Sequence, residues 1–85
     1  MASYKIQIKV SAAKELEEIP KPDLQRISKK IQSLSENPRP IGSEKLTGSE
    51  RYRIRQGNYR ILYQIDDRKI VVVVVKVGHR REVYR

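Results

Sequence analysis

The feature that most constrains the fold is a stretch of alternating polar and apolar residues that a glycine and an asparagine divide in two. It reads RYRIRQGNYRILYQID and occupies positions 51–66 of the 85-residue chain. Alternation with a period of two indicates strands that are buried on one face. Gly57-Asn58 is typical of a two-residue hairpin turn, because both residues accept positive φ. The sequence therefore predicts an antiparallel hairpin of residues 51–56 and 59–66.

This hairpin distributes its side chains over two faces, because neighbouring residues of a strand point in opposite directions. The apolar face carries Tyr52, Ile54, Ile61, Tyr63 and Ile65, and the opposite face carries Arg53, Arg55 and Arg60. Arg55 pairs with Arg60, and like charges directly opposite each other destabilise a sheet. The arginines therefore favour an anion site, because the guanidinium fork matches phosphate oxygens. A solvated face, in which arginine stems cover apolar surface, is the alternative.

The first 40 residues predict a strand followed by two helices. Residues 4–10, YKIQIKV, alternate as a half-buried strand does. Ser11 is expected to cap the first helix, which ends at Pro20. Pro22 fits the first turn of the second helix. The apolar residues of that second helix form one stripe, which can pack on a sheet: Leu24, Ile27, Ile31 and Leu34.

The rest of the chain supplies the remaining strands. Residues 70–77, IVVVVVKV, predict a strand that Gly78 is expected to end, and residues 66–69 form the turn before it. Residues 45–46 predict a short extended piece, and residues 82–85 a short edge strand. The order β-α-α-β-β-β predicts one α+β domain over residues 1–85. It has an N-terminal strand, a helical hairpin and a three- to four-stranded, mainly antiparallel sheet with the helices on one face.

The charge of the chain is concentrated in its C-terminal part. The formal net charge is +9, and residues 51–85 hold 10 Lys and Arg against 3 Asp and Glu. Such asymmetry points to a polyanionic partner, which is nucleic acid, an acidic protein segment or an anionic membrane. The absence of cysteine excludes disulfides and thiolate metal sites. No segment resembles a signal peptide or is long enough to span a bilayer, so we expect a cytoplasmic protein.

The C-terminal segment VGHRREVYR adds candidate functional residues to the three arginines. His79 is either structural or an acid–base group, and Tyr84 either stacks on a base or is a plain strand residue. Glu82 is the only acid after Asp67, so we expect no carboxylate cluster near the cations to hold a metal. Phosphodiester cleavage without a metal suits RNA, because its own 2′-OH can attack the phosphate while arginines stabilise the developing charge.

Four segments in order, NPRP, KLTG, YRIRQGNYRILYQI and VGHRREVY, resemble the RelE toxins of the RelE/ParE superfamily along essentially the whole chain. The resemblance implies a toxin that enters the ribosomal A site and cuts mRNA by 2′-OH attack, without metal or cofactor. The catalytic positions that it implies are Arg53, Arg55, Arg60, His79, Arg80 and Tyr84. From the basic character of their segments, we also expect Arg51, Arg81 and Arg85 to bind RNA. Arginine replaces the lysine that is frequent at 53 and 55, and arginine hardly deprotonates.

Two other functions share this fold or this charge. A ParE-like toxin would inhibit gyrase by binding, and a non-catalytic module would bind RNA or the ribosome without cutting. The resemblance also implies a cognate acidic antitoxin, with the toxin as a monomer alone and in a hetero-oligomer with the antitoxin. Its expected partners are thus the antitoxin, the ribosome and mRNA, and no membrane.

Overall fold

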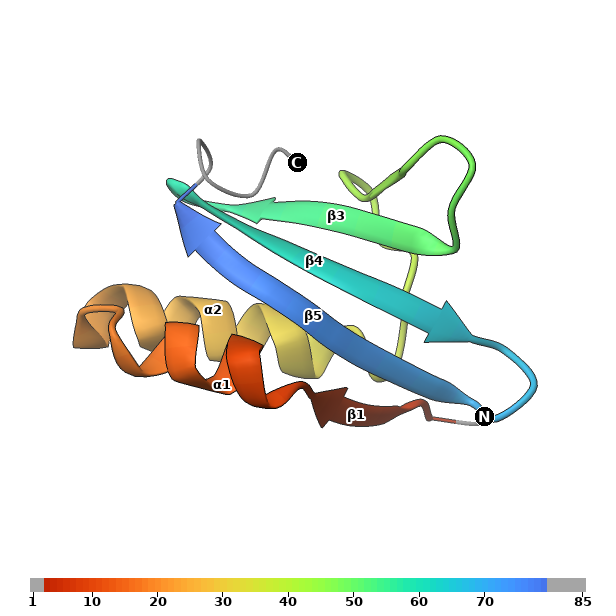
Figure 1. Cartoon of the computed structure of the whole chain (residues 1–85), viewed down its shortest axis with the longest axis horizontal. Helices are drawn as coiled ribbons and strands as arrows, with labels where there is room; N and C mark the ends of the chain where they lie inside the picture. The colour runs from red at the N-terminus through yellow and green to blue at the C-terminus, as the bar shows by residue number, and fades with distance from the viewer. Residues whose placement is uncertain (1–2, 80–85) are drawn as a thin grey trace.

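The computed structural model of the protein describes residues 3–79, which form a five-stranded sheet and two helices (Figure 1). The strand order is β1-β5-β4-β3-β2, with β1 parallel to β5 and the other pairs antiparallel. The predicted α+β class is confirmed. Along the chain the elements are β1 (Lys5–Ile8), α1 (Val10–Glu17), α2 (Lys21–Ser33), β2 (Glu44–Lys45), β3 (Arg51–Gln56), β4 (Tyr59–Asp66) and β5 (Val71–His79).

The hairpin of β3 and β4 has the predicted register. Arg55 pairs with Arg60 and Gln56 with Tyr59, so that Gly57 and Asn58 form a two-residue loop. Gly57 has a φ of 60°, whereas Asn58 does not have positive φ. This combination belongs to a type II′ turn, in which the first central residue alone needs positive φ. Only the first of the two turn residues thus uses positive φ, and the turn fixes the predicted register.

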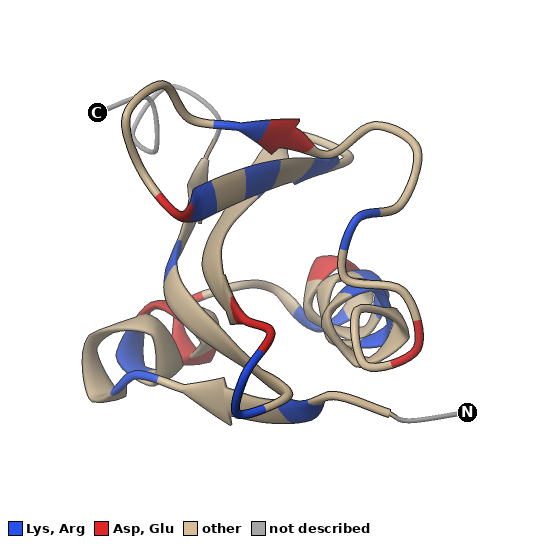
Figure 2. Cartoon of the chain, turned by 90° about the vertical axis from the view of Figure 1, so that its right-hand side faces the viewer, with Lys and Arg blue, Asp and Glu red and all other residues tan. Residues whose placement is uncertain are grey.

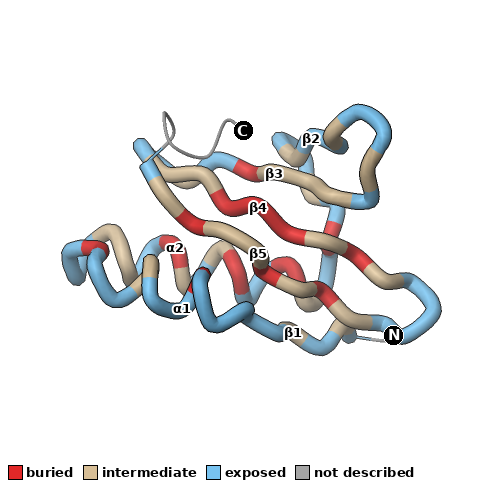
Figure 3. Tube along the Cα trace, viewed as in Figure 1, coloured by how far each residue is buried: buried red, intermediate tan, exposed pale blue. Residues whose placement is uncertain are grey.

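The core lies between the helices and one face of the sheet. Figure 3 shows buried positions along β4 and β5 and on the inner sides of both helices; in β4 three consecutive residues, 61–63, are buried. The predicted stripe of α2 is confirmed, because Ile27, Ile31 and Leu34 are buried and Leu24 packs against them. The sheet contributes the apolar face of the hairpin and three valines to the same cluster: Ile54, Ile61, Tyr63, Ile65, Val72, Val74 and Val77.

A β-bulge interrupts the pairing of β4 with β5. The register shifts between Leu62, which pairs with Lys76, and Tyr63, which pairs with Val74. One extra residue in β5 reverses the alternation, so that Val77 points to the core together with Val74. The strand then continues to His79, and the prediction that Gly78 ends it is wrong.

The first helix begins earlier than predicted and is not capped by Ser11. Lys9 occupies the cap position without a side-chain hydrogen bond, and Val10 starts α1 with its side chain largely exposed. The predicted strand of residues 4–10 is therefore too long. The reason is tertiary: the Lys9 N–H donates to the carbonyl of Val74 at 3.0 Å, which is the last contact of β1 with β5 before the chain turns into the helix.

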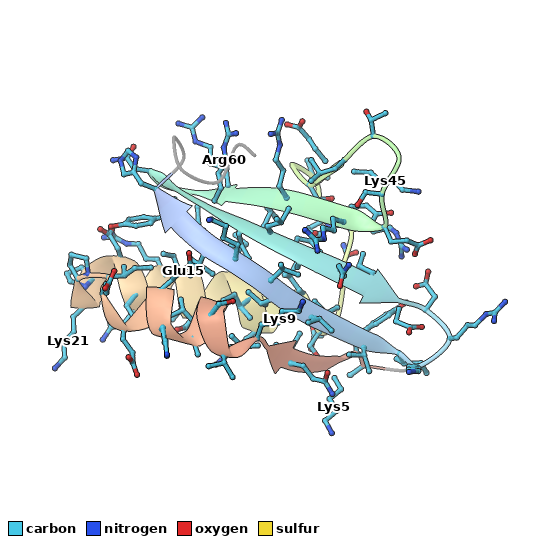
Figure 4. All side chains as sticks on the ribbon, in the orientation of Figure 1. Lys5, Lys9, Glu15, Lys21, Lys45 and Arg60 are labelled. Atoms are coloured by element: carbon cyan, nitrogen blue, oxygen red, sulfur yellow. The ribbon has the colours of Figure 1, made fainter. Side chains whose placement is uncertain are left out.

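Helix α1 provides a hydrogen-bond acceptor for the part of β5 that extends beyond its pairing with β1. The Val77 N–H donates to Glu15 Oε1 at 3.0 Å, and Lys76 Nζ lies 4.0 Å from Glu15 Oε2. Figure 4 shows Glu15 on α1, the helix that lies alongside β5. No helix within residues 3–79 has the length and apolar character needed to cross a membrane.

A polar cluster joins four distant segments. Asp67 accepts hydrogen bonds from Tyr4 Oη at 2.7 Å and from Arg39 Nη2 at 2.9 Å. Arg39 Nε also donates to Tyr52 Oη at 3.0 Å, and the guanidinium lies 5.3 Å from the centroid of the Tyr52 ring. The hydrogen bonds from Arg39 and then Tyr4 hold the pKa of the Asp67 carboxyl below its usual value. The cluster fastens Tyr4, just before β1, and the segment after α2 to the β4–β5 turn.

A second polar contact is buried. Tyr63 is fully buried, and its hydroxyl donates to the carbonyl of Pro38 at 2.7 Å. Its ring stacks on Tyr52 with centroids 5.9 Å apart. Burial raises the pKa of Tyr63 to about 12, because ionisation would place a charge in the core.

Candidate functional site

The arginines of the hairpin lie on the sheet face that the helices leave uncovered. Arg53 pairs with Leu62 and Arg55 with Arg60, so these three arginines share one face, and Arg51 extends it along β3. Figure 4 shows Arg60 pointing away from the helices, and Figure 2 shows the basic positions as successive bands along β3. The predicted gathering of Arg53, Arg55 and Arg60 is therefore present in the structure.

The three arginines line one cleft. The cleft is bounded by Gly42, Glu44, Arg53, Ile54, Arg55 and Arg60. Two of the cations are held by local contacts: Arg55 Nε donates to the carbonyl of Gly57 at 3.1 Å, and Arg53 Nη2 donates to Glu44 Oε2 at 3.1 Å. Rigid strands thus present several guanidinium groups to one volume.

Glu44 is the residue of this cleft that the sequence reasoning missed. It lies on β2 directly opposite Arg53, because β2 and β3 pair Glu44 with Arg53 and Lys45 with Tyr52. The predicted extended piece at 45–46 begins one residue too late, because β2 is Glu44–Lys45. The available signal was Gly48-Ser49, because a turn centred between these two residues pairs 44 with 53. In the structure Gly48 has the positive φ that such a turn uses.

His79 is not brought to the arginine cleft. It pairs with Tyr59, whose ring packs against the core, and the two rings meet edge to face at 5.9 Å. Beside it a hollow is lined by Glu18 and Ile19 at the end of α1. The prediction that His79 belongs with the cations is thus not supported by its position. The other predicted residues, Arg80, Arg81, Tyr84 and Arg85, lie outside the described residues.

The cleft can bind an anion that carries several oxygen atoms. Guanidinium groups stay protonated at neutral pH, and their forks match phosphate oxygens. Groups fixed in this way favour a species in which negative charge increases, since they need no rearrangement when the charge develops. Within residues 3–79 no three His, Cys, Asp or Glu side chains are grouped as metal ligands. The arrangement suits binding and stabilisation of a phosphoryl group.

Comparison with known families gives one match along nearly the whole chain. Residues 6–84 match the family described as the ParE toxin of the type II toxin–antitoxin system parDE. Among curated proteins, the chain is 31% identical to toxin RelG of Mycobacterium tuberculosis, over 96% of this chain and 97% of that protein. It is 33% identical to the mRNA interferase toxin RelE of Escherichia coli strain K12, over 96% of this chain and 90% of that protein.

Solved structures show the same fold. A toxin chain in the RelBE2 toxin–antitoxin complex of M. tuberculosis superposes with a TM-score of 0.84 and 29% identity, covering 94% of each chain. A chain of the intact E. coli RelBE complex gives a TM-score of 0.79 and 31% identity, over 91% of this chain and 96% of that one. The isolated E. coli RelE toxin gives a TM-score of 0.81 and 33% identity, over 96% of this chain and 92% of that one.

Proposed function

Because the chain belongs to the ParE toxin family of type II toxin–antitoxin systems, as a toxin of the RelE type, we propose that it cuts messenger RNA in the ribosomal A site. The observation that carries the proposal is the cleft of Arg53, Arg55 and Arg60 on an uncovered sheet face. A relative that is 33% identical is named an mRNA interferase, which supports the same activity.

The chemistry proposed is attack of the ribose 2′-OH on the adjacent phosphate. The attack forms a five-coordinate phosphorus with more negative charge than the ground state. Arginines that bind this species more tightly than the substrate lower the barrier, which is catalysis by differential binding. The role of the protein is then to orient the RNA and to stabilise charge. The products are a 2′,3′-cyclic phosphate and a 5′-OH.

The test is single-turnover cleavage of mRNA on programmed ribosomes. One mRNA carries a 2′-OH at the A-site cut position and its partner carries hydrogen there. We expect the first to be cut to a 2′,3′-cyclic phosphate and the second to stay intact. Cutting of the deoxy substrate, or a 3′-OH product, would contradict 2′-OH attack, and intact mRNA in both reactions would contradict cleavage itself.

A second candidate function rests on the family match, whose description is that of ParE. A toxin of that kind would bind gyrase and would not need the arginines as a cluster. Supercoiling by purified gyrase distinguishes the two: inhibition by the protein that persists in Arg53→Ala and Arg60→Ala variants favours the gyrase function. Stalled translation with intact mRNA would favour a ribosome-binding module without catalysis.

We further propose that a cognate acidic antitoxin neutralises the toxin in the cytoplasm. Two of the similar structures are toxin chains in complex with an antitoxin. The net charge of +9 favours an acidic partner, because opposite charges accelerate association. The expected association rate falls as salt rises, and an on-rate independent of salt would contradict electrostatic attraction.

A further inference from the structure

The arginine cleft contains a carboxylate, that of Glu44, which has no role in the ribonuclease chemistry proposed above. Glu44 on β2 faces Arg53 on β3, with Oε2 3.1 Å from Nη2. The Glu44 side chain is 67% exposed, whereas that of Arg53 is 22% exposed. The carboxylate thus stands at the open side of the cleft, anchored through one oxygen to a cation that is itself held by the sheet.

The proposed reaction requires a group that accepts the proton of the 2′-OH. Arginine cannot accept a proton at neutral pH, since its guanidinium is already protonated. His79 could, but it lies on the opposite face of the sheet beside Tyr59. Of the described residues that line the cleft, Glu44 alone has a side chain that can take up a proton.

The same ion pair has a simpler interpretation, in which Glu44 only offsets the positive charge of Arg53. Two observations argue for more than that. The contact neutralises Arg53, the very cation that a phosphate would need, so it competes with the proposed substrate. The exposure of Glu44 also leaves it accessible to an entering ribose. A phosphate that draws Arg53 toward itself would release the Glu44 carboxylate at the open side of the cleft, where it could accept a proton.

Resting on the ribonuclease function above, we propose that Glu44 is the catalytic proton acceptor. The 2′ O–H bond breaks and its proton passes to the Glu44 carboxylate, while the 2′ oxygen forms a bond to phosphorus. The bond from phosphorus to the 5′ oxygen breaks, the electron pair leaves with that oxygen, and the oxygen takes a proton from water. Glu44 then returns its proton to solvent, and no oxidant or second substrate is needed.

The experiment compares Glu44→Gln with Glu50→Gln in single-turnover cleavage on programmed ribosomes. Each variant loses one carboxylate. Glu44 is on β2 in the arginine cleft, whereas Glu50 directly precedes β3 and lines a different hollow, which Asp66 also lines. We expect Glu44→Gln to cut about a hundredfold more slowly, and Glu50→Gln to cut at the wild-type rate. Binding of both variants to ribosomes that carry the 2′-deoxy mRNA should be unchanged.

Two further readouts separate proton transfer from positioning of Arg53. The wild-type rate should fall in acid as the base becomes protonated, and this fall should be absent in Glu44→Gln. The charged groups that face Glu44 are Arg53, Arg55 and Arg60, with Lys45 beside it in β2, and none of them loses its charge in acid. Added acetate or formate should restore part of the rate of Glu44→Ala, because a small carboxylate can occupy the vacated position.

The outcomes are distinguishable. If the wild-type protein does not cut, the ribonuclease function fails. If the wild type cuts and Glu44→Gln cuts equally fast, the function stands and the role of Glu44 is overturned. A slow Glu44→Gln variant that keeps the wild-type pH profile and gains nothing from acetate would also overturn it, since Glu44 would then only position Arg53. Circular dichroism of each variant checks the fold. If Glu44→Gln or Glu44→Ala does not fold, Glu44→Asp replaces it in the test; this variant keeps a carboxylate and should retain activity.

Discussion

Arg55 on β3 and Arg60 on β4 occupy directly opposite positions of the hairpin, on the face that the helices do not cover. Two permanent positive charges in this relation repel each other, and such pairs cost a sheet a few tenths of a kcal/mol up to about 1 kcal/mol. The arrangement lowers stability in the free protein and becomes favourable when an anion lies between the two side chains. A bound phosphate would therefore stabilise the protein by relieving the repulsion.

We predict that Arg55→Gln makes the protein more stable and less active. The free energy of unfolding should rise by about 0.5 kcal/mol, because the repulsion with Arg60 is removed. Cleavage on ribosomes should fall about a hundredfold, the usual consequence of losing one group that stabilises transition-state charge. Urea unfolding and single-turnover kinetics measure the two effects.

The control for the stability effect is Arg51→Gln. It removes the same charge from the same strand, but its partner across the hairpin is Gln64. Its free energy of unfolding should not rise. A decrease in stability in Arg55→Gln would show that the hydrogen bond from Arg55 to the carbonyl of Gly57 outweighs the repulsion.

The hairpin and its arginine face could be predicted because they depend on contacts between neighbours in the sequence. A two-residue loop at Gly57-Asn58 fixes the register, and the register then determines which residues share a face. The stripe of α2 is local in the same sense. The start of α1 could not be predicted, because it depends on the hydrogen bond between Lys9 and Val74, two residues far apart in the chain.

The position of His79 could not be predicted because of the bulge in β5. Without an extra residue, alternation from Val72 and Val74 would direct His79 to the arginine face. The shift after Val74 places Val77 and His79 on the helix face. A run of valines contains no polar residue that would reveal such a shift in the sequence. One extra residue is therefore enough to move a predicted site residue to the other face of the sheet.

We predict that Asp67→Asn destabilises the protein near neutral pH and not in acid. Arg39 and Tyr4 hold the pKa of Asp67 below its usual value. A carboxyl of this kind contributes stability above its unfolded pKa, and the contribution is lost as pH falls through the depressed folded pKa. Wild type and variant should therefore converge as the pH is lowered from about 7 toward 2.

Urea unfolding at several pH values measures this difference. The matched control is Glu17→Gln, an equal change of charge on the exposed side of α1. Its difference from wild type should stay small and vary little with pH. A difference between wild type and Asp67→Asn that persists unchanged in acid would show that the cluster acts through packing and not through the charge of Asp67.

We predict that Tyr63→Phe protects the protein against alkaline unfolding while weakening it near neutral pH. The lost hydrogen bond to the carbonyl of Pro38 should cost about 1 kcal/mol. Burial raises the pKa of Tyr63 to about 12 from 10.0. The stability linked to this raised pKa is present below pH 10.0 and is lost as pH rises toward about 12.

The variant lacks the ionisable phenol, so its stability should fall less steeply over this alkaline range. Thermal unfolding, followed by circular dichroism at several pH values in this alkaline range, measures how steeply the stability of wild type and variant falls with pH. Tyr59→Phe, also on β4, is the control and should lose stability with the same slope as wild type. Equal slopes in wild type and Tyr63→Phe would show that ionisation of Tyr63 does not limit alkaline stability.

We predict that replacing Ile70 stabilises the protein. Ile70 has a φ of 56°, a left-handed conformation that is unfavourable for a β-branched residue. Such strain costs roughly 1–3 kcal/mol. Ile70 is 39% exposed, so its replacement gives up only part of the burial of a core isoleucine, and the Ile70 carbonyl still accepts from the Lys5 N–H at 2.9 Å. Ile70→Asn and Ile70→Gly should each raise the free energy of unfolding by about 1 kcal/mol.

The comparison that isolates the backbone effect is Ile41→Gly. Ile41 is fully exposed and does not have positive φ, so glycine there should only add freedom to the unfolded chain and lower stability. Urea unfolding of Ile70→Asn, Ile70→Gly and Ile41→Gly at one pH ranks their free energies of unfolding. Ile70→Asn should exceed Ile70→Gly, because asparagine tolerates the left-handed conformation and is less flexible when unfolded. If Ile70→Gly and Ile41→Gly lose stability equally, the turn before β5 stores no strain.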